Sequence, residues 1–262
     1  MRKSLFLLPP LLVLTACGGG GGVVNTEGST SMADLMAVLQ ESFREREPDI
    51  TVNYSGTGSG AGIEMVLAGA CDVGLSSRAL RDAEAAQGAV AQVAALDGVA
   101  VVVNPANPVS DLTAEEIRSI FTGETADWAE LGGTPGPIAV YGREAGSGTR
   151  GAFEESAGAV GRCRYTNEYG SSGDVVGSVA ANPGAIGYTS LSTAGSGVKA
   201  LRVGGVPCTP ETIRDGSYPI QRPFLLVTKQ GAALSPETEA FLAYARSGEA
   251  AAYIELAGVV AP

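Results

Sequence analysis

The chain is 262 residues long, with 17 basic side chains, 28 acidic side chains and a net charge of −11. An acidic surface argues against a nucleic-acid partner, because binding to nucleic acid depends on clustered lysine and arginine. The sequence contains no histidine. This excludes Ser-His-Asp and Cys-His catalysis and most zinc sites, so we expect no metal and no cofactor. The length is sufficient for two small lobes.

The N-terminus has the pattern of an export signal, predicted for residues 1–16. A basic start, Met1-Arg-Lys3, precedes an apolar run from Leu5 to Leu14 that is too short for a stable membrane span. The run ends in Leu14-Thr-Ala-Cys17, which resembles the lipobox of bacterial lipoproteins, in which the cysteine carries the lipid. Residues 17–24 are then a lipidated cysteine and a glycine-rich tether. A soluble secreted protein with an incidental cysteine is the alternative.

Three cysteines remain after Cys17, namely Cys71, Cys163 and Cys208. A disulfide is allowed outside the cytoplasm, and an odd number leaves one thiol free. Cys71 lies at the edge of an apolar run and is expected to be a small buried residue. This favours a disulfide between Cys163 and Cys208, although sequence alone does not determine connectivity.

The strongest functional signal is the segment from Tyr141 to Arg150, whose sequence is YGREAGSGTR. An apolar run precedes it and a helical pattern follows it. A strand, a glycine-rich turn and a helix together leave unpaired N–H groups and the positive end of a helix dipole at one point, which suits an anion. Arg143 adds a planar fork for two oxygens, and Ser147 and Thr149 add hydroxyl donors. The alternative is a tight turn with an incidental arginine.

Three earlier loops repeat this pattern of a strand followed by small polar residues. Gly28-Ser-Thr-Ser31 precedes a helical pattern, for which simple capping is the alternative interpretation. Gly56-Thr-Gly-Ser-Gly-Ala-Gly62 allows close backbone approach to a ligand, but it lacks the lysine of a P-loop. The third loop is Ser76-Ser-Arg78. The repetition strengthens the prediction of one anion site built from several loops.

The remaining sequence alternates between strand and helix patterns. Residues 90–103 predict a buried strand that is broken at Asp97-Gly98. A loop at Ser171-Ser-Gly-Asp174 again precedes a helical run, and Phe224-Leu-Leu-Val-Thr228 predicts another buried strand. Alternation of this kind indicates an α/β protein with mostly parallel sheets.

In their order along the chain, these motifs resemble those of phosphate-binding proteins from phosphate ABC transporters, over roughly residues 25–262. The motifs that carry the resemblance, beside the lipobox, are Gly28-Ser-Thr30, Gly56-x-Gly-Ser59, Asp72-x-Gly-x-Ser-Ser77-Arg78, Leu112-Thr-x-Glu-x-Ile117, Phe121-Thr-Gly123, Arg143-Glu-Ala-Gly-Ser-Gly-Thr149, Gly184-Ala-Ile-Gly-Tyr188 and Tyr218-Pro-x-x-Arg-Pro-Phe224. The resemblance implies an α/β, type II-like periplasmic-binding-protein fold with phosphate between two lobes. The first lobe would comprise residues 25–103 and 223–262, and the second residues 104–222.

The resemblance also implies a set of ligand contacts. The phosphate-binding residues would be Thr30, Ser31, Ser59, Ser77, Arg143, Ser147, Gly148 and Thr149. Some members of the family have an aspartate where this chain has Ser77, and that carboxylate accepts the proton of phosphate. Sulfate carries no proton at neutral pH, so such a carboxylate separates the two anions. Asp97 is the favoured acceptor in this chain, and Glu144 is the alternative.

The function implied is that of a monomeric, lipid-anchored receptor on the extracytoplasmic face of the membrane, which passes inorganic phosphate to the permease subunits of an ABC transporter. A receptor for sulfate, molybdate or another tetrahedral oxyanion is the alternative within binding proteins. A secreted phosphatase or esterase using Ser59 or Ser147 is disfavoured, because no histidine is present to act as its base. A surface adhesin or sensor would share the fold and differ in its partners.

Overall fold

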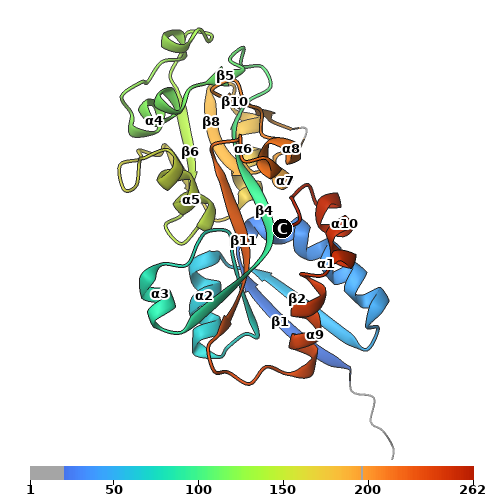
Figure 1. The fold of residues 1–262 in the computed structure, drawn as a ribbon. Helices are drawn as coiled ribbons and strands as arrows, with labels where there is room; N and C mark the ends of the chain where they lie inside the picture. Colours follow the sequence, from blue (N-terminus) through green and yellow to red (C-terminus); the bar gives the residue numbers. More distant parts are fainter. Residues whose placement is uncertain (1–20, 196) are drawn as a thin grey trace, which may run out of the picture.

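The computed structural model describes residues 21–195 and 197–262. Within these ranges, nine strands form one sheet in the order β2-β1-β3-β11-β4-β8-β6-β7, with β9 paired to β4. Figure 1 shows that the sheet extends through two lobes with helices on both. The predicted signal peptide and the predicted lipidation site, Cys17, lie outside the described residues.

The first lobe is built on β1 (Gly22–Gly28), which pairs in parallel with β2 (Ile50–Gly56) and with β3 (Val73–Ser76). Its helices come from both ends of the described chain, and the last two pack on this lobe after β11 has returned to it (Figure 1). They are η1 (Thr30–Met32), α1 (Ala33–Arg46), α2 (Ser59–Ala68), α3 (Asp82–Ala86), α9 (Pro236–Tyr244) and α10 (Gly248–Leu256).

Strand β1 begins at Gly22, which corrects the predicted tether of residues 17–24 at its C-terminal end. Val24 is completely buried and lies opposite Val52 of the parallel neighbour. Burial of this β-branched side chain in a paired strand stabilises the segment as a strand, even though glycines precede it. Any tether therefore ends before Gly22.

The second lobe has a parallel core of β8 (Ala185–Ser190), β6 (Ala139–Arg143) and β7 (Asn167–Tyr169). A capping box formed by Thr113 and Glu116 opens helix α4. The other elements of this lobe are α4 (Ala114–Thr122), α5 (Gly148–Ser156), α6 (Ser172–Ala181), α7 (Leu191–Ala194), α8 (Pro210–Arg214), η2 (Trp128–Leu131), β5 (Asp111–Leu112), β9 (Lys199–Ala200) and β10 (Arg202–Val203).

Two antiparallel strands connect the lobes, β4 (Ala89–Val103) and β11 (Gln221–Lys229) (Figure 1). Strand β4 pairs with β11 as far as Gly98 and with β8 from Val99 onward. The predicted break at Asp97-Gly98 is therefore wrong. The strand continues there, and only its partner changes.

Each lobe has its own large apolar core. Leu35, Phe43 and Phe241 are central to the first, and Phe121 and Phe153 to the second. The segment 99–103 of β4 belongs to the second core. The two cores thus meet inside β4, before the predicted boundary at residue 103, and the lobe ranges themselves stay a prediction. Among the described residues, no helix has the length and apolar character needed to cross a membrane.

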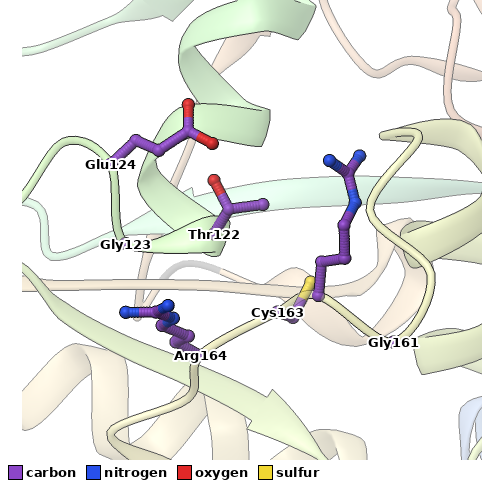
Figure 2. A pocket seen from close by; sticks show the side chains of 7 residues that line it. Thr122, Gly123, Glu124, Gly161, Cys163 and Arg164 are labelled. Atoms are coloured by element: carbon purple, nitrogen blue, oxygen red, sulfur yellow. The ribbon is translucent and has the colours of Figure 1, made fainter.

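The predicted disulfide between Cys163 and Cys208 is wrong, because both of these thiols, and that of Cys71, are free. Cys208 is buried at the crossover, where its sulfur would be 2.5 Å from a Cβ added to Gly98. Cys163 instead lines a hollow of about 480 Å³ on the second lobe, beside Thr122 and Arg164 (Figure 2). None of the predicted anion-binding residues lines this hollow.

Candidate functional site

Three loops of the first lobe bring a triad of hydroxyl groups together, Ser29, Ser59 and Ser77. Each loop follows one strand of the parallel set β1, β2 and β3, so all three leave the same edge of the sheet. Ser29 Oγ donates to Ser77 Oγ at 2.7 Å, and Ser59 Oγ lies 3.3 Å from Ser77 Oγ. The backbone N–H of Ser77 donates to Ser59 Oγ at 3.1 Å. These side chains are buried.

The loop between β6 and α5 faces this triad from the second lobe. Ser147 caps α5 by accepting from the backbone N–H of Arg150 at 3.3 Å, which leaves its own O–H free to donate. Thr149 Oγ1 lies 2.6 Å from Ser31 Oγ of the first lobe. The backbone N–H of Gly60 donates to the carbonyl of Gly146 at 3.1 Å. The two lobes therefore touch directly at the predicted site.

Gly148 is the point of closest approach between the lobes. A Cβ added at this position would lie 2.2 Å from Ser59 Oγ and 2.6 Å from Ser77 Oγ. Real Cβ atoms essentially never approach another heavy atom so closely. Glycine is thus required for the N-terminus of α5, with its unpaired N–H groups, to reach the triad.

Arg143 contributes a buried positive charge, with only 2% of the residue exposed. Its guanidinium donates from Nε to the carbonyl of Tyr169 at 3.1 Å and from Nη2 to that of Gly170 at 2.7 Å. Nη1 donates to Ser172 Oγ at 2.9 Å, and Nη2 also donates to Thr30 Oγ1 at 3.0 Å. Neutral oxygens therefore hold the group in place.

None of the ion pairs formed among the described residues includes Arg143. Burial lowers its pKa to about 10, so the guanidinium remains protonated at neutral pH. A desolvated charge without a counter-ion is costly, and an anion in contact with it removes most of that cost. The site is thus built to receive a negative charge.

A second layer of side chains holds the loop of Arg143 from behind. The backbone N–H of Arg143 donates to the Tyr188 hydroxyl at 3.2 Å, and the two hydroxyls of Tyr165 and Tyr188 are 3.1 Å apart. Arg150 donates from Nη1 to the Arg143 carbonyl at 2.9 Å and from Nε to Glu154 at 2.8 Å. Such contacts limit the movement of a charged side chain that must stay correctly aimed.

Asp97 forms no hydrogen bond with these hydroxyls and instead forms a buried ion pair with Arg222. Arg222 Nε donates to Asp97 Oδ2 at 2.9 Å, and Ser190 Oγ donates to Oδ1 at 2.8 Å. Burial raises the pKa of Asp97 and lowers that of Arg222, while each charge stabilises the other. The role of Asp97 as a proton acceptor stays a prediction, and the partners of its carboxylate weigh against it.

The alternative acceptor, Glu144, is exposed. Its Oε1 would lie 3.8 Å from a Cβ added at Gly170, the residue whose carbonyl accepts from Arg143. Within the described part of the chain, no group donates a hydrogen bond to its carboxylate. Of the predicted residues, the structure thus brings together Thr30, Ser31, Ser59, Ser77, Arg143, Ser147, Gly148 and Thr149, whereas neither predicted carboxylate forms a hydrogen bond with them.

Sequence reasoning missed Ser29 and Ser172. Ser29 precedes the predicted pair Thr30 and Ser31, and its hydroxyl joins the triad. Ser172 contacts both Arg143 and Ser31, with Oγ 2.9 Å from Ser31 Oγ. Its signal was the small polar loop before a helix at residues 171–174, which repeats the pattern of the other site loops.

Comparison with known proteins identifies the family. A family model described as a PBP superfamily domain matches residues 15–249. The phosphate-binding protein PstS of Bacillus subtilis is 35% identical over 204 residues, which cover 76% of this chain and 67% of that protein.

Two solved structures agree. One is a putative phosphate ABC transporter substrate-binding protein with bound phosphate from Clostridium perfringens, with a TM-score of 0.89 and 35% identity, covering 92% of this chain and 100% of that one. The other is an ABC-type phosphate transport receptor from Vibrio cholerae, with a TM-score of 0.75 and 34% identity, covering 91% and 100%. The chain therefore belongs to the PBP superfamily and, within it, to the family of phosphate ABC transporter substrate-binding proteins.

Proposed function

We propose that this protein binds inorganic phosphate outside the cytoplasmic membrane and delivers it to the permease of an ABC transporter. The observation that carries the proposal is Arg143, a buried guanidinium that is fixed by neutral oxygens and surrounded by hydroxyls from both lobes. The names of the relatives from Bacillus subtilis and Clostridium perfringens support phosphate as the anion. The family is one of transport receptors and not of enzymes.

Each predicted contact has a chemical role in this proposal. Arg143 spends four of its five N–H groups on the four contacts described above, and one N–H on Nη1 remains. The N–H of Nη2 that donates to Thr30 in this structure can turn to the ligand when phosphate binds. Each terminal nitrogen then donates one N–H to one oxygen of phosphate. The backbone N–H of Gly148 and the hydroxyls donate to the other oxygens. The hydroxyl donors are Thr30, Ser59, Ser147 and Thr149, whereas Ser31 lies against Thr149 and Ser77 is assigned the role of acceptor below.

The site is proposed to accept a protonated phosphate without a carboxylate. A hydroxyl both donates and accepts, so a serine of the triad can accept the P–O–H of phosphate and still donate to a neighbour. Ser77 is best placed, because it contacts both Ser29 and Ser59. Sulfate and molybdate also carry negative oxygens, and competition binding separates these alternatives.

We further propose that Cys17 is lipidated and that the protein acts as a monomer on the extracytoplasmic face, attached to the membrane through this lipid only. The lipobox-like Leu14-Thr-Ala-Cys17 supports the anchor. Replacing Cys17 with serine should move the protein to the soluble fraction with phosphate affinity unchanged. Retention of this variant in the membrane would require another anchor.

Uptake of labelled phosphate by cells tests the delivery step. Cells without this protein should import phosphate slowly at low external concentration, and the parent sequence should restore the rate. Arg143→Ala, expressed to the same level, should not restore it, because a receptor that cannot load ligand cannot deliver it. Restoration of sulfate uptake instead of phosphate uptake would overturn the choice of ligand. Crosslinking to permease subunits provides an independent check on the partner.

A further inference from the structure

The segment between β7 and α6 holds Arg143 at all three guanidinium nitrogens. Tyr169 and Gly170 accept through their carbonyls, and Ser172 accepts through its hydroxyl. Ser172 is the first residue of α6 and is 1% exposed. A buried hydroxyl in contact with a buried cation is well placed to determine where that cation points.

Ser172 is also the start of a row of hydroxyls that crosses between the lobes. Its Oγ lies 2.9 Å from Ser31 Oγ, and Ser31 Oγ lies 2.6 Å from Thr149 Oγ1. A guanidinium can only donate, so the Ser172 oxygen accepts from Arg143, and its one O–H is free to donate to Ser31. Ser31 can then donate to Thr149, which leaves the O–H of Thr149 to donate elsewhere. Rows of this kind polarise one another.

We propose that Ser172 is a positioning residue of the oxyanion site, which orients Arg143 and orders the row from Ser172 through Ser31 to Thr149. The Thr149 O–H then points to the anion instead of back into the protein. This inference rests on the proposed phosphate-binding function. It adds a residue from a fourth helix N-terminus to a site that otherwise uses the loops before η1, α2 and α5 and the end of β3.

Helix capping does not account for Ser172. The N-cap of α6 is Ser171, whose hydroxyl accepts from the backbone N–H of Asp174 at 3.1 Å and donates to its carboxylate at 2.7 Å. Loss of that cap should lower the free energy of unfolding, but it removes no hydrogen bond of Arg143. The neighbouring serine therefore provides a matched control at the start of the same helix.

The test compares phosphate binding by Ser172→Ala and Ser171→Ala in calorimetry, beside the parent protein. Removing one hydrogen bond to a charged group should weaken binding by Ser172→Ala about 10- to 100-fold. Ser171→Ala should bind within about threefold of the parent and melt at a lower temperature. Ser172→Thr, which keeps the hydroxyl, should recover most of the loss. Equal binding by Ser172→Ala and the parent would overturn the inference.

A double variant tests the row of hydroxyls itself. If Ser172 acts through Ser31, the variant carrying both Ser31→Ala and Ser172→Ala should bind about as weakly as the weaker single variant. If the affinity losses of the two single variants instead multiplied in the double variant, the two serines would act independently, which would contradict the proposed row of hydroxyls. A parent protein that binds no phosphate would contradict the proposed function instead, so the two failures are distinguishable.

Discussion

Asp97 and Arg222 face each other across β4 and β11, with Oδ2 and Nη2 2.8 Å apart, where the two strands pass between the lobes. Their side chains are 0% and 1% exposed. Arg222 Nη1 also donates to the carbonyl of Ser77 at 3.3 Å. The ion pair thus joins the crossover to the hydroxyl triad through the backbone of Ser77, and neither of its side chains forms a hydrogen bond with a hydroxyl of the triad.

Asp97→Asn should therefore act on stability more than on selectivity. The substitution leaves a buried guanidinium unpaired, which costs about 3–5 kcal/mol in free energy of unfolding. Urea unfolding measures this loss, and competition binding at a temperature where the variant is folded should give an unchanged preference for phosphate over sulfate. A collapse of that preference in Asp97→Asn would make Asp97 the proton acceptor after all, and a collapse only in Glu144→Gln would assign Glu144.

Arg143→Ala should weaken phosphate binding by about 2–5 kcal/mol, or about 30-fold or more, because a dianion loses this charged partner in a desolvated site. Arg143→Lys should recover part of the loss, since an ammonium group cannot form the planar fork. Calorimetric titration of the parent, Arg143→Lys and Arg143→Ala with phosphate measures this order of affinities. Binding by the alanine variant within threefold of the parent would exclude Arg143 as a contact.

Gly148→Ala should reduce phosphate affinity at least about tenfold, because the added methyl group clashes with Ser59 and Ser77 and forces the lobes apart. Gly146, in the same loop, provides the matched control, since a Cβ added there meets nothing within 4 Å. Gly146→Ala should bind within about threefold of the parent. Equal effects of the two substitutions would show that the lobes do not need this close approach.

The cysteines should behave as three separate thiols. Burial raises the pKa of Cys208 to about 12 and that of Cys71 to about 11, so little thiolate is present at pH 8 in the folded protein. Iodoacetamide should therefore label Cys208 slowly in the native state and rapidly after unfolding, where thiol pKa values return to about 8.5. Mass spectrometry without reductant should find Cys71, Cys163 and Cys208 all alkylated. If Cys163 and Cys208 both resisted alkylation after unfolding, the predicted disulfide between them would be present.

Each predicted site loop carries its own local signal of a strand, small polar residues and a helix, which is why a single sequence could suggest it. Sequence could not show which loops meet. Ser172 has the same local pattern as Ser59, and only the packing of α6 against β6 and β8 brings it to Arg143. The prediction for Asp97 could not take account of Arg222, which lies 125 residues later in the chain and pairs with Asp97 through the register of β4 and β11. The disulfide prediction failed for a similar reason, since distance between cysteines depends on the fold.

Calorimetric titration of the purified soluble Cys17→Ser protein with phosphate, sulfate and molybdate tests the central claim most directly. The arrangement around Arg143 predicts one phosphate bound per chain, more tightly than either other anion. The Arg143→Ala variant should lose that binding while keeping its fold. Saturable binding of sulfate or molybdate with no measurable binding of phosphate would contradict the account.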